Sequence, residues 1–312
     1  MIYDVLKRIV KAPFHLLGLD LVRRRPPVPD AGRKPKVALP PLFDDPLEAL
    51  CYQQGGRQAA FWCPLTDVVK QNGLSYSPDR WHPFVATLRE YATGDCRKYE
   101  GSILQQFYNM HQPGHAADGI VGFDQAPREF QKHPAHIYRC TPWRSRNADE
   151  VDQIVRGWSE GHGKEHSQTE GDWSFDRDGF QYHGPVSDRK GRLEYRRLTG
   201  IYERLKVDGY DRSLGHAHFL VLRRGDEFRF LNSGSGNHRT AAMAALGRKT
   251  IPATFQKDHI VEVEMAEYWP QVRDGLWTKT NAEAYFHHLF DFDSRAWARQ
   301  RGLLLDQPDP EV

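Results

Sequence analysis

The stretch FRFLNSGSGNHRTAAMAALGRKTIPATF, residues 228–255, decides the fold. Aromatic residues alternate at its start, which favours an extended strand over 228–231. Two glycines in the next segment, 233–236, let the backbone take positive φ and let a ligand approach closely. The alanine-rich run 238–246 favours a helix. Apolar residues then alternate over 251–255, so the stretch predicts strand, turn, helix and strand in that order.

The start of this helix is a candidate anion site. Asn237 or Ser235 suits the N-cap, and Gly247 suits the C-terminal stop. Helix N-termini have free N–H groups and a partial positive charge, which together bind phosphate well. The candidate phosphate-binding residues are Ser235, Gly236, Asn237, His238, Arg239 and Thr240. The alternative is a packing unit without a ligand, in which Arg239 pairs with a surface carboxylate.

The two common nucleotide motifs are absent from this stretch. No G-x-x-x-x-G-K-[ST] sequence occurs, so a P-loop is not expected. Gly234 and Gly236 are not followed by the third glycine of a dinucleotide fingerprint.

The stretch and the segment before it resemble the ParB/sulfiredoxin-like superfamily over about residues 180–262. The resemblance rests on Gly236-Asn237-His238-Arg239, Leu246-Gly247 and Ile251-Pro252, preceded by Glu194-Tyr195-Arg196-Arg197-Leu198. It implies a small mixed-sheet domain whose turn holds the phosphates of ATP or another nucleotide, with Mg²⁺. Sulfiredoxins have a cysteine where this chain has Asn237, and ParB clamps carry a helix-turn-helix that is not recognisable here. The serine-kinase branch has an acidic catalytic base at a position comparable to Glu194.

Three further residues are candidates for substrate or metal contacts. His216 and His218 would share one face of a strand, but a third metal ligand at a useful spacing is missing. Asp208 precedes a glycine in a predicted turn and could bind Mg²⁺ together with a triphosphate. The alternative for Asp208 is a turn former without chemistry, and the metal stays unspecified.

Composition limits the class of protein. With 312 residues and a net charge of +2, the chain can bury a large core, and it offers no broad basic surface for nucleic acid. Its four cysteines are scattered without a C-x-x-C pair, which predicts neither a zinc ribbon nor a disulfide framework. We therefore expect a cytoplasmic protein that does not bind nucleic acid.

The predicted fold class is α+β, with a helical N-terminal domain, a ParB/sulfiredoxin-like sheet domain and C-terminal helices. The first 25 residues form a basic amphipathic leader, which can lie on the inner face of a membrane or dock on the protein as a helix. The predicted segments are the leader 1–25, a proline-rich linker 26–43, a mostly helical domain 44–178, the nucleotide-binding domain 179–265 and a helical extension 266–312.

Together these features predict a nucleotide-dependent phosphotransferase that acts on a small hydroxyl acceptor such as a sugar or a glycan precursor. Glu194 would accept the proton of the acceptor, and His238 would stabilise charge during transfer. The alternative is a non-catalytic nucleotide- or anion-sensing module of a membrane-associated assembly.

Overall fold

The computed structural model describes residues 38–166 and 172–304, without the side chains of 257–259. Residues from Pro40 onward belong to one compact unit. The predicted leader 1–25, most of the linker 26–43 and the tail 305–312 lie outside the described residues. None of the described helices is both long enough and apolar enough to cross a bilayer.

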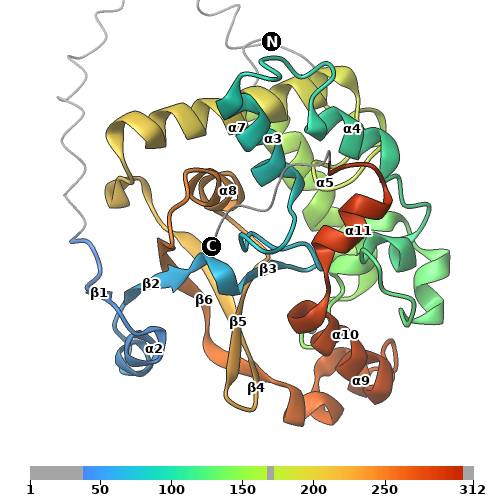
Figure 1. The fold of residues 1–312 in the computed structure, drawn as a ribbon. Coiled ribbons are helices and arrows are strands. Elements are labelled where there is room, and N and C mark those ends of the chain that lie inside the picture. The colour runs from blue at the N-terminus through green and yellow to red at the C-terminus, as the bar shows by residue number, and fades with distance from the viewer. Residues whose placement is uncertain (1–37, 167–171, 305–312) are drawn as a thin grey trace, which may run out of the picture. The chain divides into compact units, whose positions relative to one another are not determined.

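The fold is a mixed α/β arrangement around one mixed six-stranded sheet (Figure 1). The strands are ordered β1 (Leu42–Phe43), β2 (Ala60–Pro64), β6 (Thr250–Glu262), β4 (Ala217–Arg224), β5 (Glu227–Asn232) and β3 (Val68–Lys70). Strands β2 and β6 pair antiparallel, as do β4 and β5, whereas the other neighbours are parallel. The fold class predicted from sequence is confirmed at this level.

Strand β4 is buried on both faces of the sheet. Phe219 and Val221 point into one hydrophobic cluster, and Leu220 and Leu222 point into the other. A strand buried on both sides has a continuous apolar run rather than an alternating one, and β4 has such a run. The sheet is therefore the central layer of the described unit.

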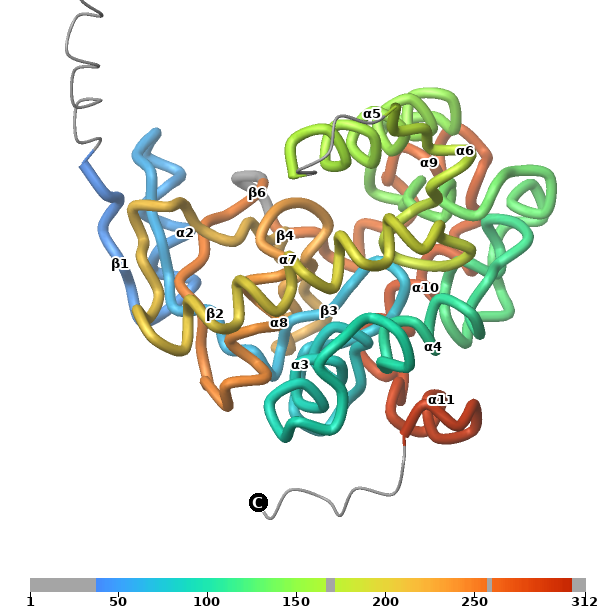
Figure 2. The backbone as a smooth tube through the Cα atoms, turned by 90° about the horizontal axis from the view of Figure 1, so that it is seen from above, coloured from blue at the N-terminus to red at the C-terminus, as the bar shows by residue number. Residues whose placement is uncertain are grey.

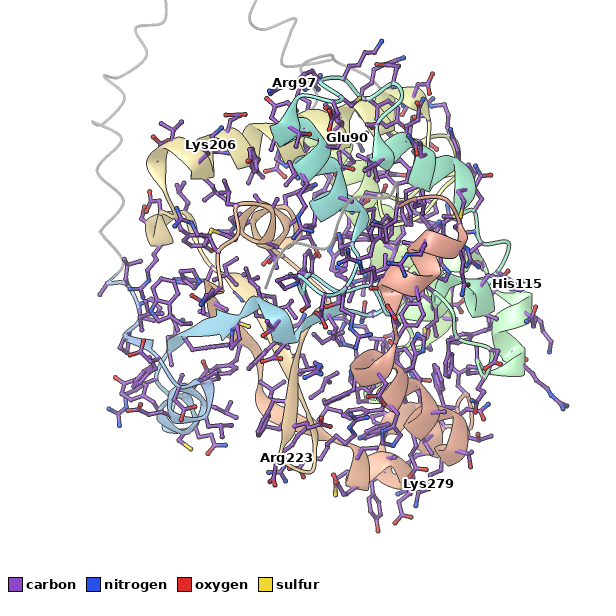
Figure 3. All side chains as sticks on the ribbon, viewed as in Figure 1. Glu90, Arg97, His115, Lys206, Arg223 and Lys279 are labelled. Atoms are coloured by element: carbon purple, nitrogen blue, oxygen red, sulfur yellow. The ribbon has the colours of Figure 1, made fainter. Side chains whose placement is uncertain are left out.

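Helices cover both faces of the sheet. Figure 2 shows α7 (Asp188–Asp208) crossing α8 (Asn237–Ala245), with α3 (Pro83–Thr93) beside them, and both α7 and α3 contact α8. Helix α10 (Lys279–Asp291) packs on the opposite face. Exposed cations such as Lys206 and Lys279 lie at the periphery (Figure 3).

The remaining helices are short apart from α5. They are α2 (Pro46–Gln54), α4 (Ile103–Met110), α5 (Ala148–His166), α6 (Phe175–Asp178), α9 (Pro270–Arg273) and α11 (Ser294–Gln300). Short 3-10 helices occur at Leu65–Asp67, Ala116–Gly119, Arg128–Lys132, Ala135–Arg139, Arg212–Leu214 and Val263–Tyr268.

The predicted boundary between a helical domain 44–178 and a sheet domain 179–265 does not divide the structure. Strands β2 and β3 come from the first of these segments, and they pair with β6 and β5 from the second. These strands are only five and three residues long. So short a run has no clear period of its own, and its partners lie far along the chain.

Two elements differ from the predicted pattern. The strand predicted at 251–255 continues to Glu262 as β6. Helix α5 continues to His166 through the polar, glycine-containing sequence after Trp158, although such a composition is typical of an exposed loop. The continuation is explained by packing, because a Cβ at Gly163 would lie 2.3 Å from the Trp173 ring. The glycine that looks like a loop signal allows a close helix contact.

Candidate functional site

The loop between β5 and α8 has the predicted glycine-rich geometry. Gly236 is the N-cap of α8, in the left-handed region at φ 92°. A Cβ there would lie 2.7 Å from the Cα of Ala217, so the position requires glycine. Because this N-cap has no side chain, no side-chain hydrogen bond caps the first turn. The N-terminal N–H groups of α8 therefore remain available to an anion.

Asn237 holds this loop in place through a buried polar network. Its Oδ1 accepts hydrogen bonds from Lys70 Nζ and from the Tyr76 hydroxyl, the latter at 3.2 Å. Its Nδ2 donates to the Tyr182 hydroxyl and to the Gly234 carbonyl, both at 2.6 Å. Both polar atoms of the Asn237 side chain are thus hydrogen-bonded within the protein, and only the backbone N–H of this residue is left for a ligand.

Two buried cations and one half-buried cation lie around the loop without a matching set of carboxylates. Arg139 donates to the Ser233 carbonyl at 2.6 Å, and Arg144 donates to the Ser233 hydroxyl at 2.8 Å. Lys70 lies 4.4 Å from the centre of the Tyr182 ring. Burial and the charge of Arg139 hold the pKa of Lys70 well below its usual value. In the described part of the chain, these three cations have no carboxylate partner within 4.0 Å.

Among the residues that the structure describes, Glu194 is the one carboxylate close to the loop, and it is completely buried. His238 Nε2 lies 3.0 Å from its Oε2, Arg197 donates to Oε1 at 3.0 Å, and Lys190 Nζ is 3.7 Å away. Burial alone would raise the pKa of Glu194. The hydrogen bond and charge interaction with His238, together with the charges of Arg197 and Lys190, hold its pKa well below the ordinary value. Glu194 therefore carries a negative charge that orients His238 and Arg197.

The two predicted cationic residues of the turn point in different directions. His238 stacks on Phe84, with the ring planes 5° apart. Burial lowers the pKa of His238, and Glu194 opposes this shift. Arg239 donates hydrogen bonds to the backbone carbonyls of residues 214–216. Arg239 thus anchors the neighbouring loop while it also lines the pocket described next.

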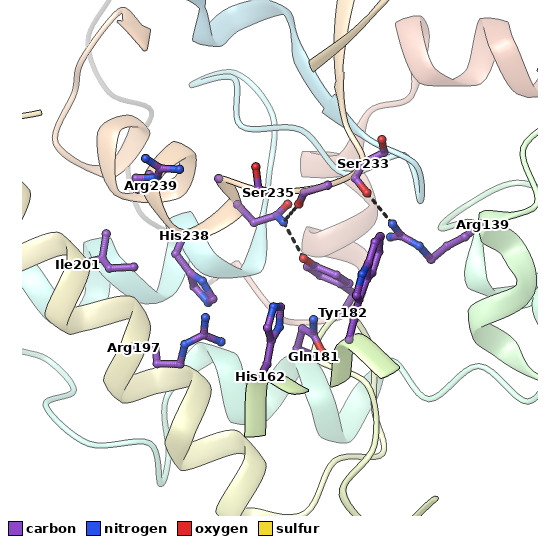
Figure 4. A pocket seen from close by; sticks show the side chains of 14 residues that line it. Arg139, His162, Gln181, Tyr182, Arg197, Ile201, Ser233, Ser235, His238 and Arg239 are labelled. Atoms are coloured by element: carbon purple, nitrogen blue, oxygen red, sulfur yellow. Dashed lines mark hydrogen bonds between the residues drawn. The ribbon is translucent and has the colours of Figure 1, made fainter. Parts of the chain in front are cut away.

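A pocket of about 400 Å³ lies against the loop (Figure 4). Residues 233–239 form one wall, and α5, α7 and the segment after α6 form the rest. The titratable side chains among its described lining residues are Arg139, His162, Tyr182, Arg197, His238 and Arg239, with no aspartate or glutamate. Burial and the charge of Arg197 lower the pKa of His162 to about 4, so its imidazole is neutral at pH 7. The wall is suited to an anionic ligand.

The pocket unites most of the predicted phosphate-binding residues. Ser235, Gly236, Asn237, His238 and Arg239 all line it. Thr240 is not part of its lining; its hydroxyl donates to the Gly236 carbonyl at 2.9 Å and so supports the first turn of α8. Glu194 lies behind His238 and Arg197 and does not line the pocket.

The other predicted contacts lie elsewhere. Asp208 lines a second pocket at the end of α7, which shares only Ile201 and Arg239 with the first. His216 contacts Arg212, and His218 contacts the Thr254 hydroxyl. Among the described residues, no group of three or more His, Cys, Asp or Glu side chains could hold a metal ion. The walls of the loop pocket thus do not fit a protein-bound Mg²⁺, for which carboxylate ligands are typical.

Several residues of the site were not predicted from sequence. They are Lys70 at the end of β3, Arg139, Trp158 and His162 on α5, Gln181 and Tyr182. None belongs to a recognisable motif, and each reaches the loop only through the tertiary fold. The buried polar character of residues 70–72 is visible only in the structure.

No family model, curated protein or solved structure matches the chain.

Proposed function

We propose that the protein is a nucleotide-dependent phosphotransferase whose loop pocket binds the phosphates of ATP or another nucleotide. The observation that supports this most is the composition of the pocket wall. Three arginines, two histidines and the open N-terminus of α8 meet there without a lining carboxylate. Such a wall stabilises a phosphate electrostatically before and during transfer.

The acceptor in this proposal is a small hydroxyl compound, such as a sugar or a glycan precursor. Its oxygen attacks the terminal phosphorus while the bond to the bridging oxygen of the leaving nucleoside diphosphate breaks. Arg197 and His238 lie on the side of the pocket shown with Arg239 in Figure 4, where they can contact the transferred group. Because Glu194 keeps both side chains in place, we assign it a positioning role instead of the role of base.

The acceptor proton requires another base in the pocket wall. His162 lines the pocket and is half-buried. A pKa of about 4 in the free protein keeps its imidazole unprotonated at pH 7. A bound phosphate raises that pKa, because a nearby negative charge favours the imidazolium form. His162 can therefore accept the hydroxyl proton when the nucleotide is present.

Calorimetric titration with ATP and with tripolyphosphate tests the phosphate site. Ser235 is exposed and lines the pocket, so Ser235→Glu places a carboxylate there without disturbing the core. We expect this variant to bind either ligand at least tenfold more weakly than wild type, whereas the neutral control Ser235→Gln changes affinity by no more than about threefold. Equal affinities of the two variants would refute the phosphate site. Binding without turnover across hydroxyl acceptors would instead favour the sensing module.

A further inference from the structure

One end of the loop pocket carries a large aromatic side chain that the proposed phosphate contacts do not use. Trp158 lines this end and is 39% exposed, although it is a large apolar residue. The guanidinium carbon of Arg139 lies 5.4 Å from the centre of its ring. Arg139 itself is 5% exposed and is fixed by its hydrogen bond to Ser233. An indole ring supported by a fixed cation and still open to the pocket is suited to stacking against a flat ring.

Gln181 adds a polar group to the same pocket. Its side chain is almost fully buried, with 3% of the residue exposed, yet its Oε1 has no hydrogen-bond partner. A buried acceptor without a partner costs folding free energy, so native proteins seldom keep one. Because Gln181 lines the pocket, a turn of its side-chain amide would present this oxygen to a ligand that donates a hydrogen bond there. The unsatisfied acceptor and the open indole ring are independent observations.

The two ends of the pocket are separated. Figure 4 shows Arg139 and Tyr182 on one side and Arg197, His238 and Arg239 on the other, with His162 and Gln181 between them. The contact with Arg139 places Trp158 at the first of these ends. A volume of about 400 Å³ is within the range of small-ligand sites. One ligand could thus have its phosphates at His238 and its flat ring at Trp158.

We propose that Trp158 and Gln181 form the nucleobase subsite of the pocket. The base stacks on the indole ring of Trp158 and donates an N–H hydrogen bond to Gln181 Oε1, as the amino group of adenine or cytosine can. This inference rests on the proposed phosphate site, and it assigns recognition of the base to α5 and to the segment after α6. Both lie before the stretch that decides the fold.

The test compares nucleoside triphosphates with tripolyphosphate, which has the phosphates and lacks the base. By calorimetry on the full chain, we expect ATP or CTP to bind at least tenfold more tightly than tripolyphosphate. Trp158→Ala should remove most of this difference, and Trp158→Phe should retain it because a stacking ring remains. Neither variant should change the affinity for tripolyphosphate by more than about threefold.

Gln181→Leu provides a second, independent readout. The substitution removes the unsatisfied acceptor with little change in size, but it also removes the hydrogen bond between the amide and Tyr182. We therefore expect thermal stability to change little while ATP affinity falls at least fivefold. An ATP analogue dimethylated at N6 should bind wild type and Gln181→Leu with equal affinity, because it cannot donate from that nitrogen.

The outcomes separate the two proposals. If tripolyphosphate binds as tightly as every nucleoside triphosphate, the nucleobase subsite is refuted and the phosphate site stands. If neither kind of ligand binds, the phosphate site fails and the subsite fails with it. Reduced affinity of Trp158→Ala for tripolyphosphate would also count against the subsite, because the effect would then come from general loss of structure.

Discussion

Substitution of Glu194 by glutamine measures how strongly its buried negative charge stabilises the cluster around it, without any substrate. The carboxylate is completely buried among Lys190, Arg197 and His238, at 3.0 to 3.7 Å. Removing one partner of a buried ion pair costs about 3–5 kcal/mol, because the other charge stays buried without compensation. The amide of glutamine keeps one acceptor for His238, so we expect a loss near the lower limit, about 3 kcal/mol. For a unit of this size, this corresponds to a decrease in Tm of roughly 5 °C.

Urea and thermal denaturation measure this loss directly. Glu203→Gln is the matched control, since Glu203 lies on the same helix α7 and is partly exposed. We expect the control to change the free energy of unfolding by less than about 0.5 kcal/mol. If Glu194→Gln is as stable as the control, the buried cluster does not need the negative charge, and the positioning role is wrong.

The pH dependence of the same variant gives a second check. The folded state holds the pKa of Glu194 below its ordinary value of 4.5. As the pH falls, the carboxylate is therefore protonated in the unfolded chain before it is protonated in the folded protein. The stabilisation is therefore present above pH 4.5 and is lost as the pH falls below that value. The difference in stability between wild type and Glu194→Gln should be largest near pH 7 and should shrink in acid.

Three further predictions concern the loop, the ligand and the acid stability of the fold. In urea denaturation, Gly236→Ala should lower the free energy of unfolding by at least about 2 kcal/mol more than Gly247→Ala does. Both positions have positive φ, but only at Gly236 would an added Cβ lie 2.7 Å from Ala217. Equal losses in the two variants would exclude the close contact. Binding of tripolyphosphate near pH 6 should take up more protons in wild type than in His162→Asn, because the anion raises the pKa of His162, which is about 4 in the free protein. Calorimetry in buffers of different ionisation enthalpy measures this difference. Identical proton uptake by the two proteins would contradict the placement of His162. Burial lowers the pKa of His183 from 6.5 to about 4, so as the pH falls the unfolded chain takes up this proton before the folded protein does. The free energy of unfolding should therefore decrease by up to about 3 kcal/mol between pH 6.5 and 4. A His183→Asn variant that loses the same stability over this pH range would refute this assignment.

The local geometry around the loop could be predicted from the sequence. Strand, glycine turn and helix follow one another in residues 228–246, and each depends on neighbours in the chain. The N-cap prediction of Asn237 or Ser235 is wrong, because Gly236 occupies this position. The reason is tertiary, since Ala217 leaves no room for a Cβ at Gly236 and the network with Lys70 uses the Asn237 side chain.

The rest of the site depends on contacts between distant segments. The spacing of Lys190, Glu194 and Arg197 on one helix indicates that they can pair, but only the fold shows that Glu194 is buried. Trp158 and Gln181 carry no local signal, since a lone tryptophan and a lone glutamine occur in many surroundings. The ParB/sulfiredoxin-like resemblance stays a prediction, because no comparison supports or contradicts it.

The placement of β3 at the edge beside β5 has a consequence for how the chain reaches its native state during synthesis. Lys70 leaves the ribosome early, but its strand pairs with β5, where Val68 is opposite Phe230. Until β5 and α8 have been made, the strand lacks its neighbour in the sheet and the Lys70 side chain lacks Asn237. Pairing between such distant segments is slow, because a long loop must close before the contact is gained. Nascent chains that stop short of residue 237 should consequently expose this edge and depend on chaperones.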